Sequence, residues 1–167
     1  MEEGGNPGGR LLGGRRGAVS RSNPMRMVDI SDKEVVHRSA EAVGMIRLKE
    51  GTMDAIRTGA VEKGDPLAAA EIACVLAAKR TPEIVPLCHP VPLTSIDAEF
   101  TLGGGFVEAR CRVAADYKTG VEMEALTGVS AALLTIWDMV KYLEKDEAGQ
   151  YPDTAITDIR VIEKRKG

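Results

Sequence analysis

The chain has 167 residues, of which 44% are hydrophobic and 28% charged, as expected for a soluble globular protein with one core of its own. A net charge of −3 and an aromatic content of 4% argue against nucleic-acid binding, which needs a basic face or stacking platforms. Three widely separated cysteines form no disulfide framework, and no apolar run approaches the roughly 20 residues that span a membrane, so we expect a cytoplasmic protein.

Residues 1–26 differ in composition from the rest of the chain, being rich in glycine and arginine and poor in apolar side chains. Such a segment buries too little apolar surface to offset the entropy of ordering it. We therefore predict that residues 1–26 are disordered and that residues 27–167 form a single domain.

The first predicted elements are a strand over residues 43–48 and a short helix over residues 53–57, closed by a glycine at position 59. A longer helix is predicted over residues 66–80, because Asp65 is a good N-cap and proline is tolerated in the first helical turn. Its packed face is predicted from residues at helical spacing, three of them apolar. These residues are Ile72, Val75, Leu76 and Lys79.

Four prolines between residues 81 and 93 argue against regular helix there. Alternating apolar and polar residues over 96–102 and 107–113, joined by three glycines, predict a β-hairpin with one buried face. A second long helix over 126–145 and a closing strand over 155–162 complete the pattern. Two helices on one face of an antiparallel sheet make an α+β fold of ferredoxin-like type.

The glycine patterns that bind nucleotide phosphates are absent from the sequence, so it predicts no P-loop. Cations offer another way to bind an anion. Lys63 comes just before the helix N-terminus at Asp65, which suits an anion but is equally typical of a loop lysine beside an ordinary cap. Lys79 and Arg80 end the same helix, where they either complement the helix dipole or face a polyphosphate. Spacing alone does not decide between these alternatives.

The segment Leu87-Cys88-His89 lies between two prolines, Pro86 and Pro90, which restrict its backbone. A histidine held in this way suits proton transfer, and a merely packed histidine is the alternative. A zinc site would need further cysteine or histidine ligands nearby, which the sequence lacks. No metal site is predicted.

Two groups of charged residues complete the candidates. Glu122 and Glu124 share a face only in extended backbone, and solvated surface acids are the usual explanation for such a pair. Asp138 and Lys141 are three positions apart on a predicted helix, so their side chains are neighbours. They form either a surface ion pair or a pair in a cleft, in which each group shifts the pKa of the other. Along a continuous helix Glu124 and Asp138 would lie roughly 21 Å apart. We therefore expect Glu124 to precede the helix and the site to be assembled from two chains.

Taken in order, these motifs resemble the molybdenum cofactor biosynthesis protein C family, the cyclic pyranopterin monophosphate synthases. The resemblance covers about residues 27–165. Its segments are MVDIS (27–31), KGD (63–65), AAKRT (77–81), IVPLCHP (84–90), KTGVEMEALT (118–127), ALLTIWDMVK (132–141) and the pair Lys145-Asp146.

The resemblance implies a lyase whose single catalytic domain converts 3′,8-cyclo-7,8-dihydroguanosine 5′-triphosphate into cyclic pyranopterin monophosphate and releases pyrophosphate. It also implies a homohexamer, built as a trimer of dimers with sites at the dimer interface. The sequence requires no cofactor, and Mg²⁺ bound with the triphosphate is compatible with it.

The resemblance also implies which residues form the site. Asp138, Lys141, Lys63 and His89 take catalytic roles. Substrate contacts come from Leu87, Cys88, His89, Glu122, Met123, Glu124, Arg38, Lys79 and Arg80. Ring opening and cyclisation need repeated proton transfers, and departure of pyrophosphate needs nearby cations. As a hypothesis, Lys63, Arg38, Lys79 and Arg80 hold phosphates, while Asp138 and Lys141 handle protons.

Two other classes of protein compete with this interpretation. A non-catalytic nucleotide-binding module would use the cations but would not need the carboxylate of Asp138. An RNA-binding ferredoxin-like domain would show a basic surface and an aromatic strand, and the sequence has neither.

Overall fold

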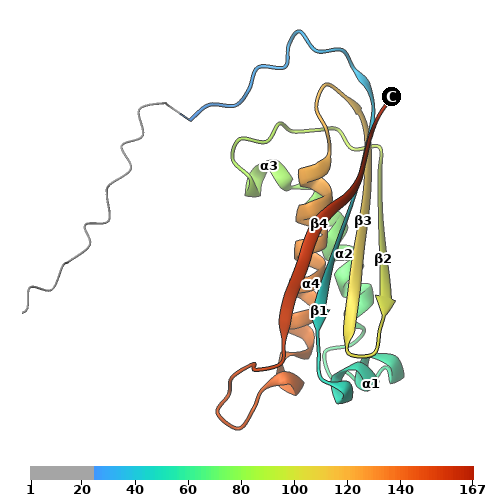
Figure 1. The fold of residues 1–167 in the computed structure, drawn as a ribbon, viewed down its shortest axis with the longest axis vertical. Coiled ribbons are helices and arrows are strands. Elements are labelled where there is room, and N and C mark those ends of the chain that lie inside the picture. The colour runs from blue at the N-terminus through green and yellow to red at the C-terminus, as the bar shows by residue number, and fades with distance from the viewer. Residues whose placement is uncertain (1–24) are drawn as a thin grey trace, which may run out of the picture.

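A four-stranded antiparallel sheet organises residues 25–167, the part of the chain that the computed structural model describes (Figure 1). Nearly all of the segment predicted to be disordered lies outside the described residues. The strands are β1 (Val36–Arg47), β2 (Ser95–Leu102), β3 (Phe106–Tyr117) and β4 (Ala155–Lys166), in the sheet order β2-β3-β1-β4. The helices are α1 (Glu50–Thr58), α2 (Pro66–Lys79), α3 (Thr81–Ile84) and α4 (Glu122–Glu144).

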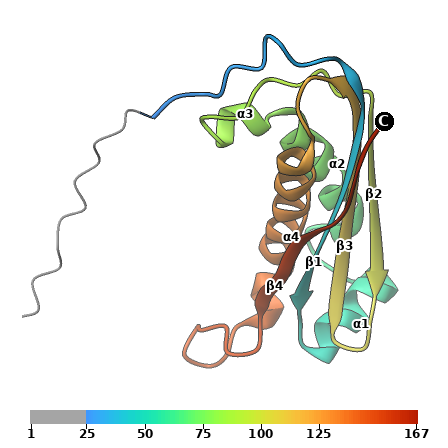
Figure 2. The same cartoon turned by 45° about the horizontal axis from the view of Figure 1, so that its top comes forward.

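The helical layer covers one face of the sheet, with α4 beside α2 (Figures 1 and 2). Gly44 on β1 sets the closeness of this contact, since a Cβ there would lie 2.8 Å from Leu133 Cδ1 and 2.9 Å from Val129 Cγ1 on α4. Only glycine lets the helix lie so near the central strand. Together with the antiparallel sheet, this one-sided layer confirms the predicted α+β fold.

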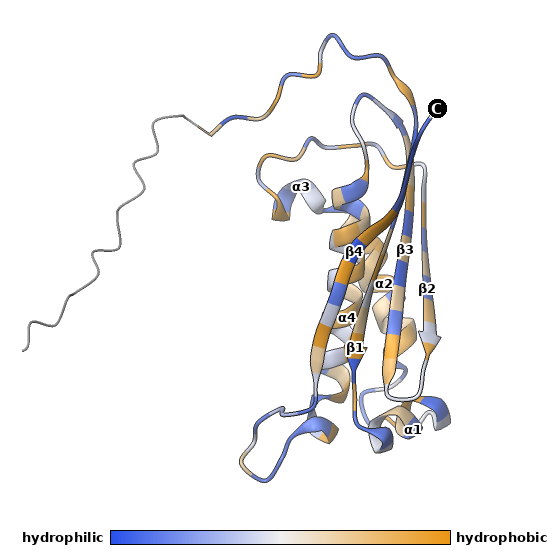
Figure 3. Ribbon diagram, in the orientation of Figure 1, coloured by the Kyte–Doolittle hydropathy of each residue, from blue (hydrophilic) through white to orange (hydrophobic). Residues whose placement is uncertain are grey.

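The β2–β3 hairpin agrees with the predicted alternation. Side chains of β3 that face the helices are fully buried, and their neighbours carry charge toward the open face, which Figure 3 shows as alternating colours along the strand. The buried set is Val107, Ala109, Cys111, Val113 and Ala115. Strand β3 continues to Tyr117 because its end pairs with Val36 on β1.

Strand β1 begins seven residues before the predicted start at residue 43. Its first half contains His37, Arg38 and Ser39, a polar run that gives no apolar signal for a strand. The run is extended because β1 is central and pairs with β3 on one side and β4 on the other. Strand β4 likewise extends past the predicted end, to Lys166.

The predicted packed face of α2 is wrong. Ile72 is 63% exposed and Leu76 47% exposed, while the buried residues of α2 are Pro66, Ala70, Cys74 and Ala78. Small side chains face α4 and allow a close approach, helped by a glycine at position 128 of α4, where a Cβ would lie 3.0 Å from Cys74 Sγ.

The connection after α2 contains one helical turn that the prolines had argued against. Helix α3 starts at Thr81, whose buried hydroxyl donates to the carbonyls of Ala77 and Ala78. Pro82 sits in the first turn, where no amide hydrogen is required. Residues 85–94 then follow without helix or strand.

Helix α4 differs from prediction in two ways. It begins at Glu122, so the expectation that Glu124 precedes the helix is wrong. By length and composition it is also apolar enough to cross a membrane, contrary to the prediction that no apolar run approaches that length. Its apolar side chains at positions 129, 133, 136 and 140 are fully buried in the core that it shares with the sheet, so α4 is a core helix.

Candidate active site

A cavity of about 480 Å³ lies at the N-terminal end of α4, and we call it the His89 pocket. Three segments that are distant in sequence form it: residues 28–33, the connection after α3, and the start of α4. It brings together six of the predicted substrate-contacting residues, among them His89, which is also in the predicted catalytic set. Its lining is Val28, Ile30, Lys33, Leu87, Cys88, His89, Val91, Thr119, Gly120, Glu122, Met123 and Glu124.

The imidazole of His89 is oriented by the segment in front of it. Its Nε2 lies 2.8 Å from the carbonyl oxygen of Val28. A carbonyl only accepts hydrogen bonds, so Nε2 carries a proton and donates it. In the neutral ring Nδ1 is then the free acceptor. Lys118 Nζ donates to the carbonyl of Ser31 at 2.6 Å and ties the same segment down a second time.

The two carboxyl groups of the pocket have different environments. Glu124 is 3% exposed, and its burial raises the pKa of the carboxyl. Burial acts in the same direction on the pKa of Glu122 and is the largest single influence. The hydrogen bond from Lys164 Nζ at 2.6 Å, a backbone hydrogen bond and the charges of Lys164 and Arg38 together outweigh it, so the pKa falls below its usual value. Paired acids with pKa values pushed apart are typical of acid–base sites. Burial and the nearby Glu124 also raise the pKa of the Cys88 thiol.

We expect Glu124→Gln to raise the free energy of unfolding near neutral pH. The folded-state pKa of Glu124 lies above its unfolded value, so its ionisation opposes folding. The free-energy cost of ionising Glu124 is absent at pH values below its pKa in the unfolded state and is complete at pH values above its pKa in the folded state. Urea denaturation should therefore show a stabilised variant at about pH 7 and little difference at about pH 3. An equal gain at both pH values would contradict the assignment.

A second group of charges lies at the other end of α4, and we call it the Asp138 cluster. Lys141 Nζ is 2.7 Å from Asp138 Oδ1, and Lys63 Nζ is 2.8 Å from Asp138 Oδ2. Lys63 also donates to the backbone carbonyl of Asp138 at 2.9 Å. The structure thus brings together three of the four predicted catalytic residues, including one from the loop between α1 and α2.

The electrostatics of the Asp138 cluster follow from these contacts. Hydrogen bonds from Lys141 and then from Lys63 lower the pKa of Asp138 to about 2, so this carboxyl is ionised near neutral pH. In return, the hydrogen bond with Asp138 raises the pKa of Lys141. The cluster therefore presents two ammonium groups gathered on one carboxylate, all partly open to solvent.

The remaining predicted residues lie apart from both groups or beside them. Arg38 donates to the carbonyl of Tyr117 at 3.2 Å and lines a small cavity of about 100 Å³ that shares Glu122 with the His89 pocket. Lys79 lines a separate hollow between α2 and β2, and Arg80 is exposed at the C-cap of α2. Within one chain, Lys79 belongs to neither the His89 pocket nor the Asp138 cluster.

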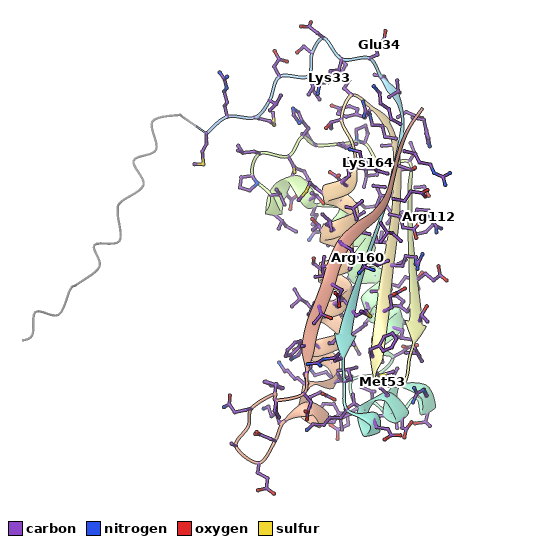
Figure 4. All side chains as sticks on the ribbon, viewed as in Figure 1. Lys33, Glu34, Met53, Arg112, Arg160 and Lys164 are labelled. Carbon is purple, nitrogen blue, oxygen red and sulfur yellow. The ribbon has the colours of Figure 1, made fainter. Side chains whose placement is uncertain are left out.

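Sequence reasoning missed two cations of the His89 pocket region. Lys33 lines the pocket, and Lys164 pairs with Glu122; both lie at the end of the molecule where the chain ends, opposite Met53 (Figure 4). Lys164 gave no signal because it lies beyond the predicted end of the last strand. Among residues 25–167, no group of three or more His, Cys, Asp or Glu side chains could hold a metal ion.

Helix α4 holds the two groups apart. Glu124 is in its first turn and Asp138 is 14 positions further on, roughly 21 Å along the axis. The N-terminal end of α4 lies toward α3 and its C-terminal end toward α1 (Figure 1). One small molecule does not span both groups within a single chain.

Comparison with known proteins identifies the family of the chain. A family model described as the MoaC family matches residues 27–167. A probable cyclic pyranopterin monophosphate synthase of Thermococcus kodakarensis is 61% identical over 143 residues, covering 86% of this chain and 92% of the relative. The probable cyclic pyranopterin monophosphate synthase of Pyrococcus abyssi is also 61% identical, over 85% of this chain and 89% of its own. In Methanothermobacter thermautotrophicus a relative 60% identical, with the same two coverages, is called a probable cyclic pyranopterin monophosphate synthase accessory protein. The chain belongs to the MoaC family.

Proposed function

We propose that this chain is a cyclic pyranopterin monophosphate synthase of molybdenum cofactor biosynthesis. It is a lyase that rearranges 3′,8-cyclo-7,8-dihydroguanosine 5′-triphosphate into cyclic pyranopterin monophosphate and releases pyrophosphate. The Asp138 cluster carries this proposal beyond family membership. Phosphate binding alone would use Lys63 and Lys141 but would gain nothing from the carboxylate between them, whereas proton transfer needs it.

The roles follow from the electrostatics. Asp138 keeps Lys141 in its ammonium form and fixes its direction, so Lys141 is the proton donor of the pair. In the His89 pocket, Glu124 holds a proton more readily than Glu122 does, and Nδ1 of His89 accepts one. These groups handle protons at the rings.

Phosphate binding falls to the cations. Lys63, with Arg38, Lys79 and Arg80, supplies positive charge for the triphosphate and for the departing pyrophosphate. A Mg²⁺ ion carried by the triphosphate would be held mainly through the phosphates, in keeping with the lack of a metal-ligand cluster among residues 25–167.

The complete site forms between two copies of the chain. Two-fold pairing of the helical layers with α4 antiparallel would place the His89 pocket of one copy beside the Asp138 cluster of the other. Exposed apolar side chains on the helices support such an interface: Ile72 and Leu76 on α2, and Leu134, 61% exposed, on α4. We extend this to a homohexamer, a trimer of such dimers. The β-α-β-β-α-β order supports a ferredoxin-like subunit, and the free cysteines support a reducing, cytoplasmic location.

Turnover of the cyclised guanosine triphosphate tests the function. We expect product pterin from the wild type and a loss of about 10²–10⁴-fold in Lys63→Ala, Asp138→Ala and Lys141→Ala. Asp54→Ala is the matched control, because Asp54 forms an exposed ion pair with Arg57 at the same helical spacing, on α1. No turnover by a folded, assembled wild type would overturn the proposal.

The name of the Methanothermobacter relative favours a second candidate, a non-catalytic accessory protein that binds the nucleotide. The same variants separate the two candidates. Asp138→Ala that keeps substrate affinity but loses turnover identifies an enzyme. A wild type that binds the triphosphate without converting it identifies the accessory protein.

A further inference from the structure

The loop that carries Lys63 is fixed to α4 at a second point, which lies outside the Asp138 cluster. The hydroxyl of Tyr142 accepts a hydrogen bond from the backbone N–H of Glu62 at 2.9 Å. Tyr142 follows Asp138 by four positions, so both lie on the same face of α4. Two consecutive loop residues, Glu62 and Lys63, therefore dock on two consecutive turns of one helix face.

The Tyr142 contact is not needed to satisfy the backbone. Glu62 is exposed, so water could solvate its N–H if the tyrosine were absent. The loop is already anchored in the core by Val61, which is 5% exposed. What the hydroxyl adds is a fixed position for the peptide group between Val61 and Glu62, one residue before Lys63.

That position matters because a lysine side chain is long and flexible. The side chain samples many rotamers, and its ammonium pairs with Asp138 in only some of them. Restricting the side chain to those rotamers costs conformational entropy. Holding the backbone next to Lys63 narrows the space that the ammonium can search. Preorganisation of this kind contributes to rate without any contact with substrate.

We propose that Tyr142 is a positioning residue for the reaction, acting through the Glu62 peptide to hold the Lys63 ammonium against Asp138. This inference rests on the proposed function. Tyr142 is partly exposed, so Tyr142→Phe removes one oxygen and keeps the ring packing. We expect kcat/KM to fall about fivefold, the size of one ordinary hydrogen bond, with the melting temperature almost unchanged.

A double-mutant cycle distinguishes positioning from a general structural role. If Tyr142 acts through Lys63, Tyr142→Phe will have no further effect in a Lys63→Ala background, measured by single turnover at high enzyme concentration. A structural role would cost the same factor in both backgrounds. Thr135→Val is the matched control, since the Thr135 hydroxyl donates within its own helix, to the carbonyl of Ala131 at 2.8 Å.

Amide hydrogen exchange gives an independent readout, because the Glu62 N–H should exchange faster in Tyr142→Phe and not in Thr135→Val. An active wild type with a fully active Tyr142→Phe variant would overturn the positioning role and leave the function standing. A fivefold loss that persists without Lys63 would overturn it too. No turnover by the wild type would instead overturn the proposed function, and this role of Tyr142 with it.

Discussion

Asp138→Ala and His89→Ala, each expected to be inactive alone, should recover about a quarter of the wild-type activity when they are unfolded together and refolded in equal amounts. The reason is that each proposed site takes the His89 pocket from one copy and the Asp138 cluster from the other. Random pairing makes half of the dimers mixed, and a mixed dimer has one site with both substitutions and one with neither. Turnover per chain in the refolded mixture measures the recovery.

The matched control for this experiment combines two variants of the same cluster, Asp138→Ala and Lys63→Ala. Every site of that mixed dimer contains one of the two substitutions, so no activity should return. Recovery in the control as well would show that the two variants were not inactive. No recovery in the mixture with His89→Ala would show that the site does not combine the two groups from different copies.

Glu144→Ala should lower the free energy of unfolding by about 2–4 kcal/mol. Glu144 is the last residue of α4 and its side chain is fully buried. Its carboxylate accepts from the backbone N–H of Lys49, at 3.1 and 3.3 Å, and from the hydroxyl of Thr154. Alanine leaves both donors without a partner and opens a cavity. Urea denaturation of the purified variant gives the difference.

Two variants sharpen this second measurement. Glu147→Ala removes an exposed acid from the neighbouring loop and should change stability by less than about 0.5 kcal/mol. Glu144→Gln keeps the shape and one acceptor but buries an amide donor, so an intermediate loss is expected. If Glu144→Ala were no less stable than Glu147→Ala, the buried carboxylate would not join α4 to the start of α1.

Elements with local signals were predictable from the sequence. Asp65 caps α2 as expected, accepting from the amides of Leu67 and Ala68 at 2.8 and 3.2 Å. The alternating hairpin was also correct. By contrast, the start of α4 carries no such signal, because its N-cap Val121 makes no side-chain capping bond. The position of Glu124 was wrong for that reason.

The buried face of α2 shows a different limit. Its alanine-rich sequence offers two sets of residues at helical spacing, and only the partner helix selects between them. The contacts of the candidate site are likewise of two kinds, those that local spacing predicts and those that depend on the fold. Asp138 and Lys141 are neighbours by spacing alone, whereas the contact of Lys63 with Asp138 joins positions 75 residues apart and exists only in the fold.

The length of helix α4 sets the distance between the two groups of candidate site residues. Because the His89 pocket lies near one end of α4 and the Asp138 cluster near the other, the length of the helix fixes the distance between them, and in the proposed dimer the second copy must match that distance. Inserting one residue near the middle of α4 would lengthen the distance by about 1.5 Å and rotate one group by about 100° relative to the other. The connecting loops could change length without altering this distance or rotation. Insertions should therefore be tolerated much better in the loops than in helix α4.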